Sequence, residues 1–332
     1  MKHSSFLTAA VLFGVLSLFT SCRYKDLCYD HNHDTTPNLV LRLELNLDLD
    51  IEIDVDIQDE NHTQIKIPSY MVVCFYDTLS GSLKYMEYVE SYGGPLHVNP
   101  GTYDMVVYSF DTEWTQVRGE NHIDSLEAFT SDITATKAPQ FALFPRKDTT
   151  ETAPGPIIYT PDHLLVTSKR VEIPPYSIEE QVITVTATAA TIAETYSFEV
   201  QNIEGIEYVS SVEAFITNQA RANYFGRGEL CTDPATIYFP MEVNRTGNSI
   251  KSTFNTFGKL PGEIRSYLNI LMIDSEGKAH TRVTDVTEQF GDTLHTIVLK
   301  DTIVIPAPAA GGGGIAPTVE EWEEVNRDVP IG

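Results

Sequence analysis

The chain has 332 residues, 42% of them apolar, and a formal net charge of −25 at pH 7. A protein this acidic repels nucleic acids and anionic surfaces, which excludes nucleic-acid binding as its expected function. The length is sufficient to bury a sizeable core and favours about two domains.

The first 21 residues have the features of a secretory signal peptide. Lys2 gives a positive start, residues 6–19 form a short apolar run, and the small residues Thr20 and Ser21 precede a processing site. The apolar run is too short for us to expect a membrane-spanning helix there.

Residues 18–22, with the sequence LFTSC, resemble the lipobox of bacterial lipoproteins, in which a small residue precedes a cysteine that becomes lipidated and N-terminal. The resemblance implies that Cys22 carries a lipid and that the protein is an outer-membrane lipoprotein at the cell surface. Phe19 departs from the commonest lipobox, which has Leu there, so a secreted soluble protein and an uncleaved membrane anchor stay as alternatives. Several acyl chains hold a protein stably because each buried CH₂ contributes about 0.8 kcal/mol.

Residues 22–38 are polar and predict a tether between the lipid and the first domain. Within the tether, His31 and His33 alternate with Asp and Asn and follow Cys28, a set that could hold zinc or copper. A tether has no scaffold that fixes the geometry of metal ligands, so metal binding there is the weaker hypothesis.

Residues 39–57 alternate between apolar and mostly acidic side chains. The alternation predicts a strand with one buried face and one wet face, on which the acids recur about every 6.7 Å. Calcium needs about six to eight converging oxygens, usually from a curled loop, and no glycine turns the chain here. Asp48 and Asp50 are therefore weak metal candidates, and a solvated strand face is the favoured interpretation.

This alternating segment is longer than a usual strand. At about 3.3 Å per residue, its 19 residues would extend for about 60 Å. We therefore expect it to bend or to pass from one sheet to another. Its protruding edge is then a candidate for pairing with a neighbouring molecule.

Short apolar segments separated by Gly, Pro and Asn turns follow, a pattern typical of an all-β sandwich. The expected strands of this series are 70–76, 83–89, 96–98, 103–110 and, after a Pro-rich excursion over 137–161, 169–173. Consecutive prolines cannot donate to a sheet, so Pro174 and Pro175 predict the end of an N-terminal β-sandwich over 39–175.

A second series of apolar segments predicts a C-terminal β-sandwich over 176–305. Its expected strands are 181–192, 196–203, 209–216, 237–243, 250–257, 267–273, 280–286 and 296–304. Residues 306–332 form a Gly-rich link and an acidic tail. An apolar set in that tail could dock onto a domain or bind a partner, and consists of Val319, Trp322, Val325 and Ile331.

No catalytic fingerprint stands out in the sequence. It contains no nucleophile elbow, zinc-protease motif, phosphate-binding loop or dinucleotide fingerprint. Pairs of acids occur by chance in a chain with 47 acids, so they do not indicate a glycosidase. We expect no enzyme activity and no cofactor. Tyrosines such as Tyr85, Tyr88 and Tyr103 favour core packing, with a sugar-binding platform as the alternative.

Three blocks of sequence resemble an uncharacterised family of Bacteroidetes surface lipoproteins that is similar to FimB-type fimbrial anchor and fimbrillin-like proteins. The blocks are residues 22–31, residues 100–108 together with 125–130, and the Gly-rich link followed by Trp322. The resemblance implies two tandem transthyretin-like β-sandwich domains. It also implies a lipid-held anchor or accessory subunit of a surface pilus, with fimbrial subunits joined by strand donation.

Strand donation fills an incomplete sandwich, whose apolar groove and unpaired backbone a neighbour's strand completes. In the resembled family, shaft subunits are thought to mature by cleavage after a basic residue. Arg42 and Lys66 are poor candidates for such a cleavage, because Arg42 lies inside the first alternating segment and no clean site precedes a strand. The resemblance therefore favours an anchor that keeps its first strand and contacts the next subunit through its tail. A carbohydrate- or nutrient-binding surface lipoprotein is the alternative function.

Overall fold

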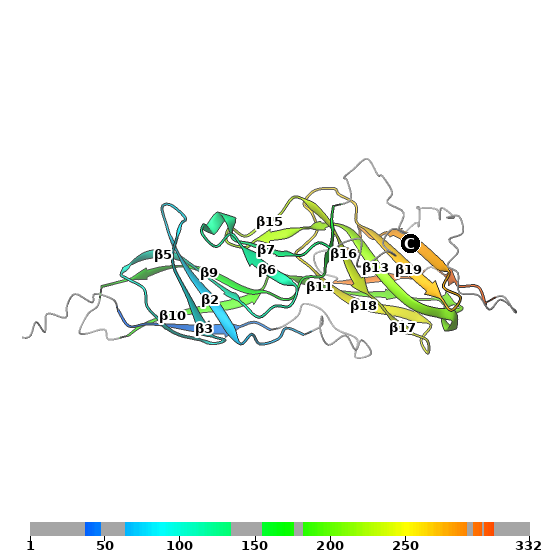
Figure 1. Ribbon diagram of the computed structural model, residues 1–332, viewed down its shortest axis with the longest axis horizontal. Helices are drawn as coiled ribbons and strands as arrows, with labels where there is room; N and C mark the ends of the chain where they lie inside the picture. The colour runs from blue at the N-terminus through cyan, green and yellow to red at the C-terminus, as the bar shows by residue number, and fades with distance from the viewer. Residues whose placement is uncertain are drawn as a thin grey trace, which may run out of the picture.

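The computed structural model describes residues 37–47, 64–133, 155–175, 182–290, 295–300 and 302–308. These residues form an elongated all-β molecule, and the first described strand begins at one end of the long axis while the last described residues lie at the other (Figure 1). Among the described residues, two short 3-10 turns, η1 (Ile123–Ser125) and η3 (Ile206–Tyr208), interrupt the strands. Within the described ranges, no helix is long and apolar enough to cross a membrane.

Seven strands close into a barrel at the N-terminal end of the molecule. In the order of the barrel they are β1 (Leu39–Leu45), β10 (Ile183–Thr191), β9 (Leu165–Ile173), β5 (Gly101–Ser109), β2 (Tyr70–Asp77), β3 (Leu83–Glu90) and β4 (Gly93–Leu96). Side chains alternate across β2, so Met71, Val73 and Phe75 fill the barrel while Val72, Cys74 and Tyr76 point outward. Both faces of β2 are buried, which explains its continuous apolar sequence.

Two sheets enclose the core of the C-terminal end. One has the order β20 (Ala279–Asp285), β19 (Tyr267–Asp274), β13 (Val209–Ala220), β16 (Pro234–Pro240) and β8 (Ile157–Tyr159). The other has the order β17 (Glu242–Asn244), β18 (Ser249–Thr256), β11 (Glu194–Val200) and β21 (Thr296–Leu299). Phe239 and Phe254 stack with their ring centroids 4.4 Å apart, which joins the two sheets through aromatic contacts.

Two smaller sheets complete the fold. β12 (Ile203–Glu204) pairs in parallel with β22 (Ile303–Val304). The other small sheet has the order β15 (Glu229–Leu230), β14 (Ala222–Tyr224), β7 (Glu127–Thr130) and β6 (Thr115–Arg118). It covers the outer face of the barrel, where a buried cluster combines side chains from both halves of the chain.

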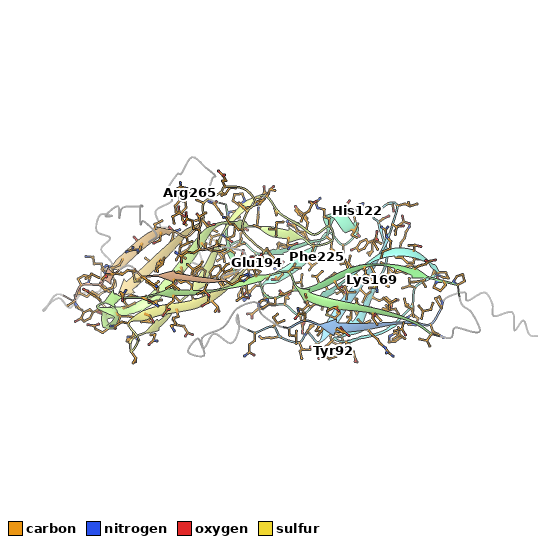
Figure 2. The ribbon with its side chains drawn as sticks, turned by 180° about the vertical axis from the view of Figure 1, so that it is seen from behind. Tyr92, His122, Lys169, Glu194, Phe225 and Arg265 are labelled. Carbon is orange, nitrogen blue, oxygen red and sulfur yellow. The ribbon has the colours of Figure 1, made fainter. Side chains whose placement is uncertain are left out.

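This shared cluster lies near the middle of the long axis. Phe225, labelled in Figure 2, packs edge-on against Tyr108 of the barrel with their ring centroids 5.5 Å apart. Leu126 and Ala220 are fully buried in the same cluster. Strands from early and late parts of the chain share one core here. The barrel and the C-terminal part of the fold are therefore packed against each other.

The all-β class is confirmed, and so is the alternation of the first strand over the residues described. Leu39, Leu41 and Leu43 are buried while Arg42 and Glu44 are exposed. The remainder of the alternating segment, with Asp48 and Asp50, lies outside the described residues. Cys74 of β2 is a fully buried free thiol.

Strand pairing differs from the expected division of the chain in two places. The segment expected to open the second sandwich is β10, which pairs with β1 and β9 in the barrel. Conversely, β8 precedes Pro174 and Pro175 but pairs with β16 at the other end of the molecule. The barrel also closes, unlike the two separate sheets of a sandwich, because β1 bridges β4 and β10. The boundary between 39–175 and 176–305 stays a prediction.

Candidate functional site

The position of the first strand is the feature of this fold that bears most directly on function. On one side β1 pairs in parallel with β10 through seven residue partners, from Leu39 and Ile183 to Leu45 and Ala189. On the other side it pairs antiparallel with β4 through four partners. The strand is therefore held on both edges, and we call the space between β4 and β10 the β1 slot.

Backbone hydrogen bonds extend the pairing with β10 at both ends of β1. The Ile183 N–H donates to the Asn38 carbonyl at 2.8 Å, and the Asn46 N–H donates to the Ala189 carbonyl at 2.8 Å. The buried side chains of β1 contribute further, because each leucine buried from water is worth about 1.5–3 kcal/mol. The slot thus holds β1 through the backbone ladder with β10 and through the burial of the leucine face of β1.

A close approach of two backbones shapes the other edge of the slot. Gly93 in β4 has a φ of +99°, and a Cβ on it would lie 2.1 Å from the carbonyl oxygen of Leu41. Only glycine accepts both the left-handed φ and this approach. Gly93 therefore allows β4 to pair with β1.

Of the two basic residues considered as cleavage positions, Arg42 lies within β1 and Lys66 lies in the segment that links β1 to β2. Arg42 is exposed, but its backbone faces Thr186 of β10 on one edge and Gly93 of β4 on the other. Lys66 is exposed in the segment that precedes β2. Proteolysis at Arg42 would therefore require β1 to leave its slot first.

A polar network that the sequence did not predict holds the chain where it crosses between the two ends of the molecule. Asn255 of β18, only 1% exposed, accepts a hydrogen bond from Thr195 at 2.9 Å and donates from its side-chain amide to the Pro161 carbonyl at 2.9 Å. Thr195 lies 3.2 Å from His163, whose other ring nitrogen lies 3.0 Å from Thr191. Because the Thr195 hydroxyl donates to Asn255, Nε2 of His163 is the donor to Thr195.

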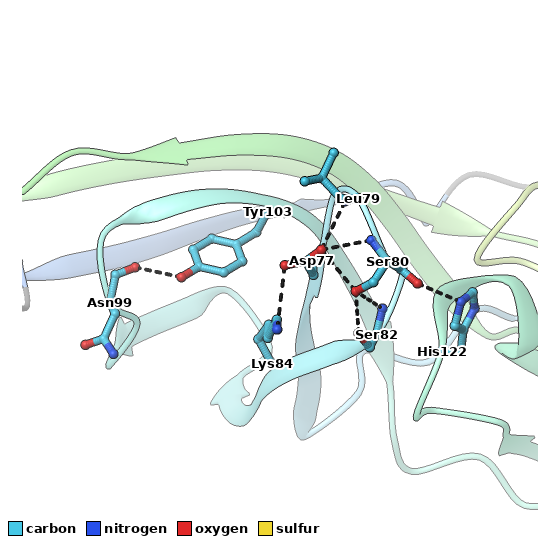
Figure 3. A network of polar contacts seen from close by, with 8 residues as sticks. All are labelled: Asp77, Leu79, Ser80, Ser82, Lys84, Asn99, Tyr103 and His122. Atoms are coloured by element: carbon cyan, nitrogen blue, oxygen red, sulfur yellow. Dashed lines mark hydrogen bonds and ion pairs between the residues drawn. The ribbon is translucent and has the colours of Figure 1, made fainter.

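The hairpin between β2 and β3 carries a second network, drawn in Figure 3. Oδ1 of Asp77 accepts hydrogen bonds from the Ser80 N–H at 2.8 Å, the Leu79 N–H at 3.1 Å and the Ser80 hydroxyl at 3.0 Å. The Ser80 N–H, followed by the Ser80 hydroxyl, lowers the pKa of Asp77 below its ordinary value. His122 donates from Nε2 to the Ser80 carbonyl at 2.9 Å, which fixes the turn to η1. The arrangement stiffens the turn between β2 and β3.

The tyrosines considered for a sugar-binding platform divide between core and surface. Tyr103 is 9% exposed and packs edge-on against Tyr85 with ring centroids 5.8 Å apart. Tyr88, in contrast, is 59% exposed and meets the 58% exposed Phe110 edge-on at 5.7 Å. Tyr70, 55% exposed, lies on the same face of β2 as Val72, the partner of Tyr88. We call Tyr70, Tyr88 and Phe110 the aromatic patch.

The structure offers little support for other chemistry. In the part of the chain that it describes, no group of three or more His, Cys, Asp or Glu side chains could hold a metal ion. Burial raises the pKa of the Cys74 thiol to about 11, which leaves the thiol protonated and unreactive. A polar groove of about 620 Å³ beside β12 is lined by Glu199, Glu204 and Glu207 and by amide and glycine residues. No histidine or cysteine is among the described residues that line it.

The remaining predicted site residues lie outside the described residues and stay predictions. They are Cys22 for lipidation, His31, His33, Asp48 and Asp50 as weak metal candidates, and Val319, Trp322, Val325 and Ile331 for partner binding.

Comparison with known protein families decides the relationship. A model described as a domain of unknown function, DUF5119, matches residues 21–240, which is well over half of the chain. The chain belongs to the DUF5119 family. The matched part includes every strand of the barrel and continues to the end of β16. The resemblance to an uncharacterised family with fimbrial anchor relatives is thereby confirmed.

Relatives of this DUF5119 chain carry fimbrial and adhesin names. It is 24% identical over 306 residues to the "Putative fimbrium anchoring subunit Fim4B" of Bacteroides ovatus, covering 80% of this chain and 86% of that protein. A crystal structure described as a "putative adhesin" from Bacteroides ovatus overlays with a TM-score of 0.58 at 23% identity, covering 87% of this chain and 98% of that one. The fimbrial anchor protein Mfa2 from Porphyromonas gingivalis overlays with a TM-score of 0.42 at 13% identity, covering 76% and 83% of the two chains. The adhesin overlay shows that the two chains share their fold.

Proposed function

We propose that this DUF5119 chain is a cell-surface structural protein that serves as an anchor or accessory subunit of a fimbrium and so contributes to adhesion. The observation that carries the proposal is the filled β1 slot, in which Leu39, Leu41 and Leu43 complete the barrel. The name of the Bacteroides ovatus relative, a fimbrium anchoring subunit, supports the same role.

A filled slot suits an anchor because of what strand donation requires. A neighbour's strand can pair only with an edge that is free, and its side chains can enter only a groove that is empty. In this chain both edges of the slot pair with β1, and the barrel interior already contains its leucines. An anchor that keeps its own first strand needs no donor at this position.

The lipid and the tail complete the proposal. A lipid on Cys22 holds the chain in the outer membrane, and Val319, Trp322, Val325 and Ile331 bind the next fimbrial subunit by strand donation. Supporting this, the described chain begins next to β1 and stops after β22, at opposite ends of the long axis (Figure 1). The described residues that precede the tail and those that follow the tether therefore lie far apart.

We also propose that the two ends of the molecule are tandem transthyretin-like domains. The C-terminal end, with two sheets packed around one core, supports a sandwich. At the N-terminal end, β1 is the strand that closes the barrel, because it pairs with β4 on one edge and with β10 on the other. An enzyme activity forms no part of the proposal.

The experiment compares three forms of the tagged chain in its own host: wild type, Cys22→Ala and a chain ending at residue 308. Outer-membrane fractions are isolated and the proteins that co-purify with each form are identified. Wild type is expected in the outer membrane with a fimbrial subunit bound. Cys22→Ala should leave the membrane fraction, and the shortened chain should stay there without its partner. Retention of the partner by the shortened chain would contradict the role of the tail.

The aromatic patch favours a second candidate function, the capture of a carbohydrate. Exposed rings offer the apolar faces on which sugars stack, and Glu90, the partner of Tyr70 across β2 and β3, offers an acceptor for hydroxyl groups. A glycan array should give hits with wild type that Tyr88→Ala and Phe110→Ala lose, whereas Val283→Ala, exposed on β20, should keep them. An array without hits would remove this candidate.

A further inference from the structure

We propose that the fold is a tension-bearing joint, in which load applied between the tether and the tail acts as shear on the parallel strand ladders at the two ends of the molecule. The proposal rests on the proposed function only for the source of the load, because an anchor is pulled from both ends. The ladders themselves are properties of the described strands. They provide this chain with a mechanical function in addition to adhesion.

The load path has a central element that runs along the long axis. Residues 183–204 contain β10, β11 and β12 in direct succession, and only Ile192 and Ala193 separate β10 from β11. We call residues 183–204 the spine. It passes from the barrel into the C-terminal sheets, so one continuous segment connects the two ends of the molecule (Figure 1).

The first and last described strands both run parallel to the spine. At the N-terminal end, β1 pairs with β10 through seven partners. At the C-terminal end, β21 pairs with β11 through four partners and β22 pairs with β12 through two. Additional backbone hydrogen bonds extend the C-terminal ladder, from Ser197 to the His295 carbonyl and from Ile305 to the Glu204 carbonyl, both at 2.8 Å.

The parallel arrangement determines how force reaches the hydrogen bonds. A pull on the N-terminal side of β1 draws that strand backward along its axis, while a pull beyond β22 draws the C-terminal strands forward. Hydrogen bonds of a parallel ladder are evenly spaced, so a displacement along the strands loads all of them together. A pull perpendicular to the strands would instead break the hydrogen bonds one after another. Shear is therefore the direction in which these ladders resist force best.

Buried side chains and polar contacts prevent the strands from sliding. Leu41 in β1 is 1% exposed and Ile297 in β21 is fully buried, so sliding by one residue would turn apolar side chains toward water. At the centre of the spine, Thr191 contacts His163, and Thr195 contacts both His163 and Asn255. This network holds the point where load passes from the barrel to the C-terminal sheets.

The other strands of the barrel lie beside the load path. Between β1 and the spine, the chain forms the barrel strands β2, β3, β4, β5 and β9 as well as β6, β7 and β8, and none of these is needed to transmit force from β1 to β10. Load on β1 consequently reaches the spine directly through the β1–β10 ladder, and the chain between these two strands does not carry it. The joint fails only when a ladder is sheared.

Single-molecule force spectroscopy tests the proposal by loading the same ladder in two directions. The mature chain carries Cys22→Ser and Cys28→Ser, while Cys74 and Cys231 are buried and do not accept handles. In the shear geometry, handles attach through Asn38→Cys and Pro308→Cys. In the peeling geometry, they attach through Asn38→Cys and Val182→Cys, which lie at the same end of the β1–β10 ladder. All three positions are exposed.

We expect the first rupture in the shear geometry to need a severalfold higher force than in the peeling geometry at equal loading rate, because forced unfolding reports the barrier along the pulling direction. Equal rupture forces in the two geometries, or a lower force in shear, would overturn the proposal. The measurement needs no fimbria, so its failure is distinguishable from failure of the anchor function. Thermal unfolding of the two labelled chains should coincide, which checks that the handles leave the fold intact.

Discussion

Leu39 lies opposite Ile183 in the first pair of the parallel ladder that joins β1 to β10. The pair connects the beginning of the first strand to the beginning of the spine, although most of the barrel strands lie between them in sequence. From Leu39 onward the odd-numbered side chains Leu41 and Leu43 are buried in the barrel. This pairing connects the buried face of β1 directly to the spine.

Removing a buried side chain from β1 should destabilise the barrel. Leu41 is 1% exposed, so Leu41→Ala is expected to lower the free energy of unfolding by about 2–5 kcal/mol. Arg42→Ala, on the wet face of the same strand, should change it by less than about 0.5 kcal/mol. Urea denaturation of the mature chain measures both. Equal effects of the two substitutions would show that β1 does not use its leucine face in the core.

A side chain at Gly93 should prevent β4 from pairing closely with β1, whereas a side chain at the adjacent Gly94 should not. Gly93→Ala places a Cβ 2.1 Å from the Leu41 carbonyl at a φ of +99°, and should destabilise the protein by more than about 1 kcal/mol. Gly94→Ala is the matched control, because its Cβ would lie 3.7 Å from Val89, an ordinary contact. Differential scanning calorimetry should give a clearly lower Tm for Gly93→Ala. A Tm equal to that of Gly94→Ala would contradict the described pairing of β4.

The β2–β3 hairpin should contribute a pH-dependent stabilisation. Hydrogen bonds from Ser80 hold the pKa of Asp77 below its unfolded value of about 3.9, so the ionised carboxylate favours the folded state. This contribution is present above pH 4 and is lost as the pH falls through the lowered folded pKa. Asp77→Asn should therefore flatten the fall of stability below about pH 4. Urea midpoints that decline in parallel for wild type and Asp77→Asn would refute the assignment.

The crossing network should stabilise the middle of the spine. Asn255→Ala leaves the Pro161 carbonyl without its donor and the Thr195 hydroxyl without its acceptor, at an expected cost of about 1–3 kcal/mol. Glu242→Ala, exposed on the neighbouring β17, is the control and should be close to neutral. Hydrogen exchange should increase in Asn255→Ala around Thr191 and Thr195. Unchanged exchange there would mean that the network does not hold the crossing.

Local sequence patterns predict the elements of this fold well and their partners poorly. The alternation at Leu39, Leu41 and Leu43 is sufficient to predict the buried face, because side chains of a strand alternate with a period of two. The same pattern cannot tell whether β10 pairs within the barrel or with later strands. That choice depends on contacts between residues far apart in sequence, and it moves β8 and β10 across the expected boundary.

The sequence likewise predicts one part of the candidate site and misses another. The alternating segment predicts the buried leucine face of β1, but the expected protruding edge is not found in the described strand, because β10 and β4 pair with both of its edges. The sequence does not predict the network around His163 and Asn255, because one histidine before a strand and one asparagine within another have no mutual spacing that indicates contact. A signal was present in retrospect, since Asn255 is a polar residue inside an otherwise buried strand and such residues usually have hydrogen-bond partners.

Intact-mass spectrometry of the protein extracted from the outer membrane of its own host tests the central claim most directly. An anchor that keeps its first strand should yield one mature chain that begins at an acylated Cys22 and continues uncut through Arg42 and Lys66. A chain that begins after Arg42 or after Lys66 would have lost β1 wholly or in part. That result would identify a processed subunit with an open slot and contradict the account.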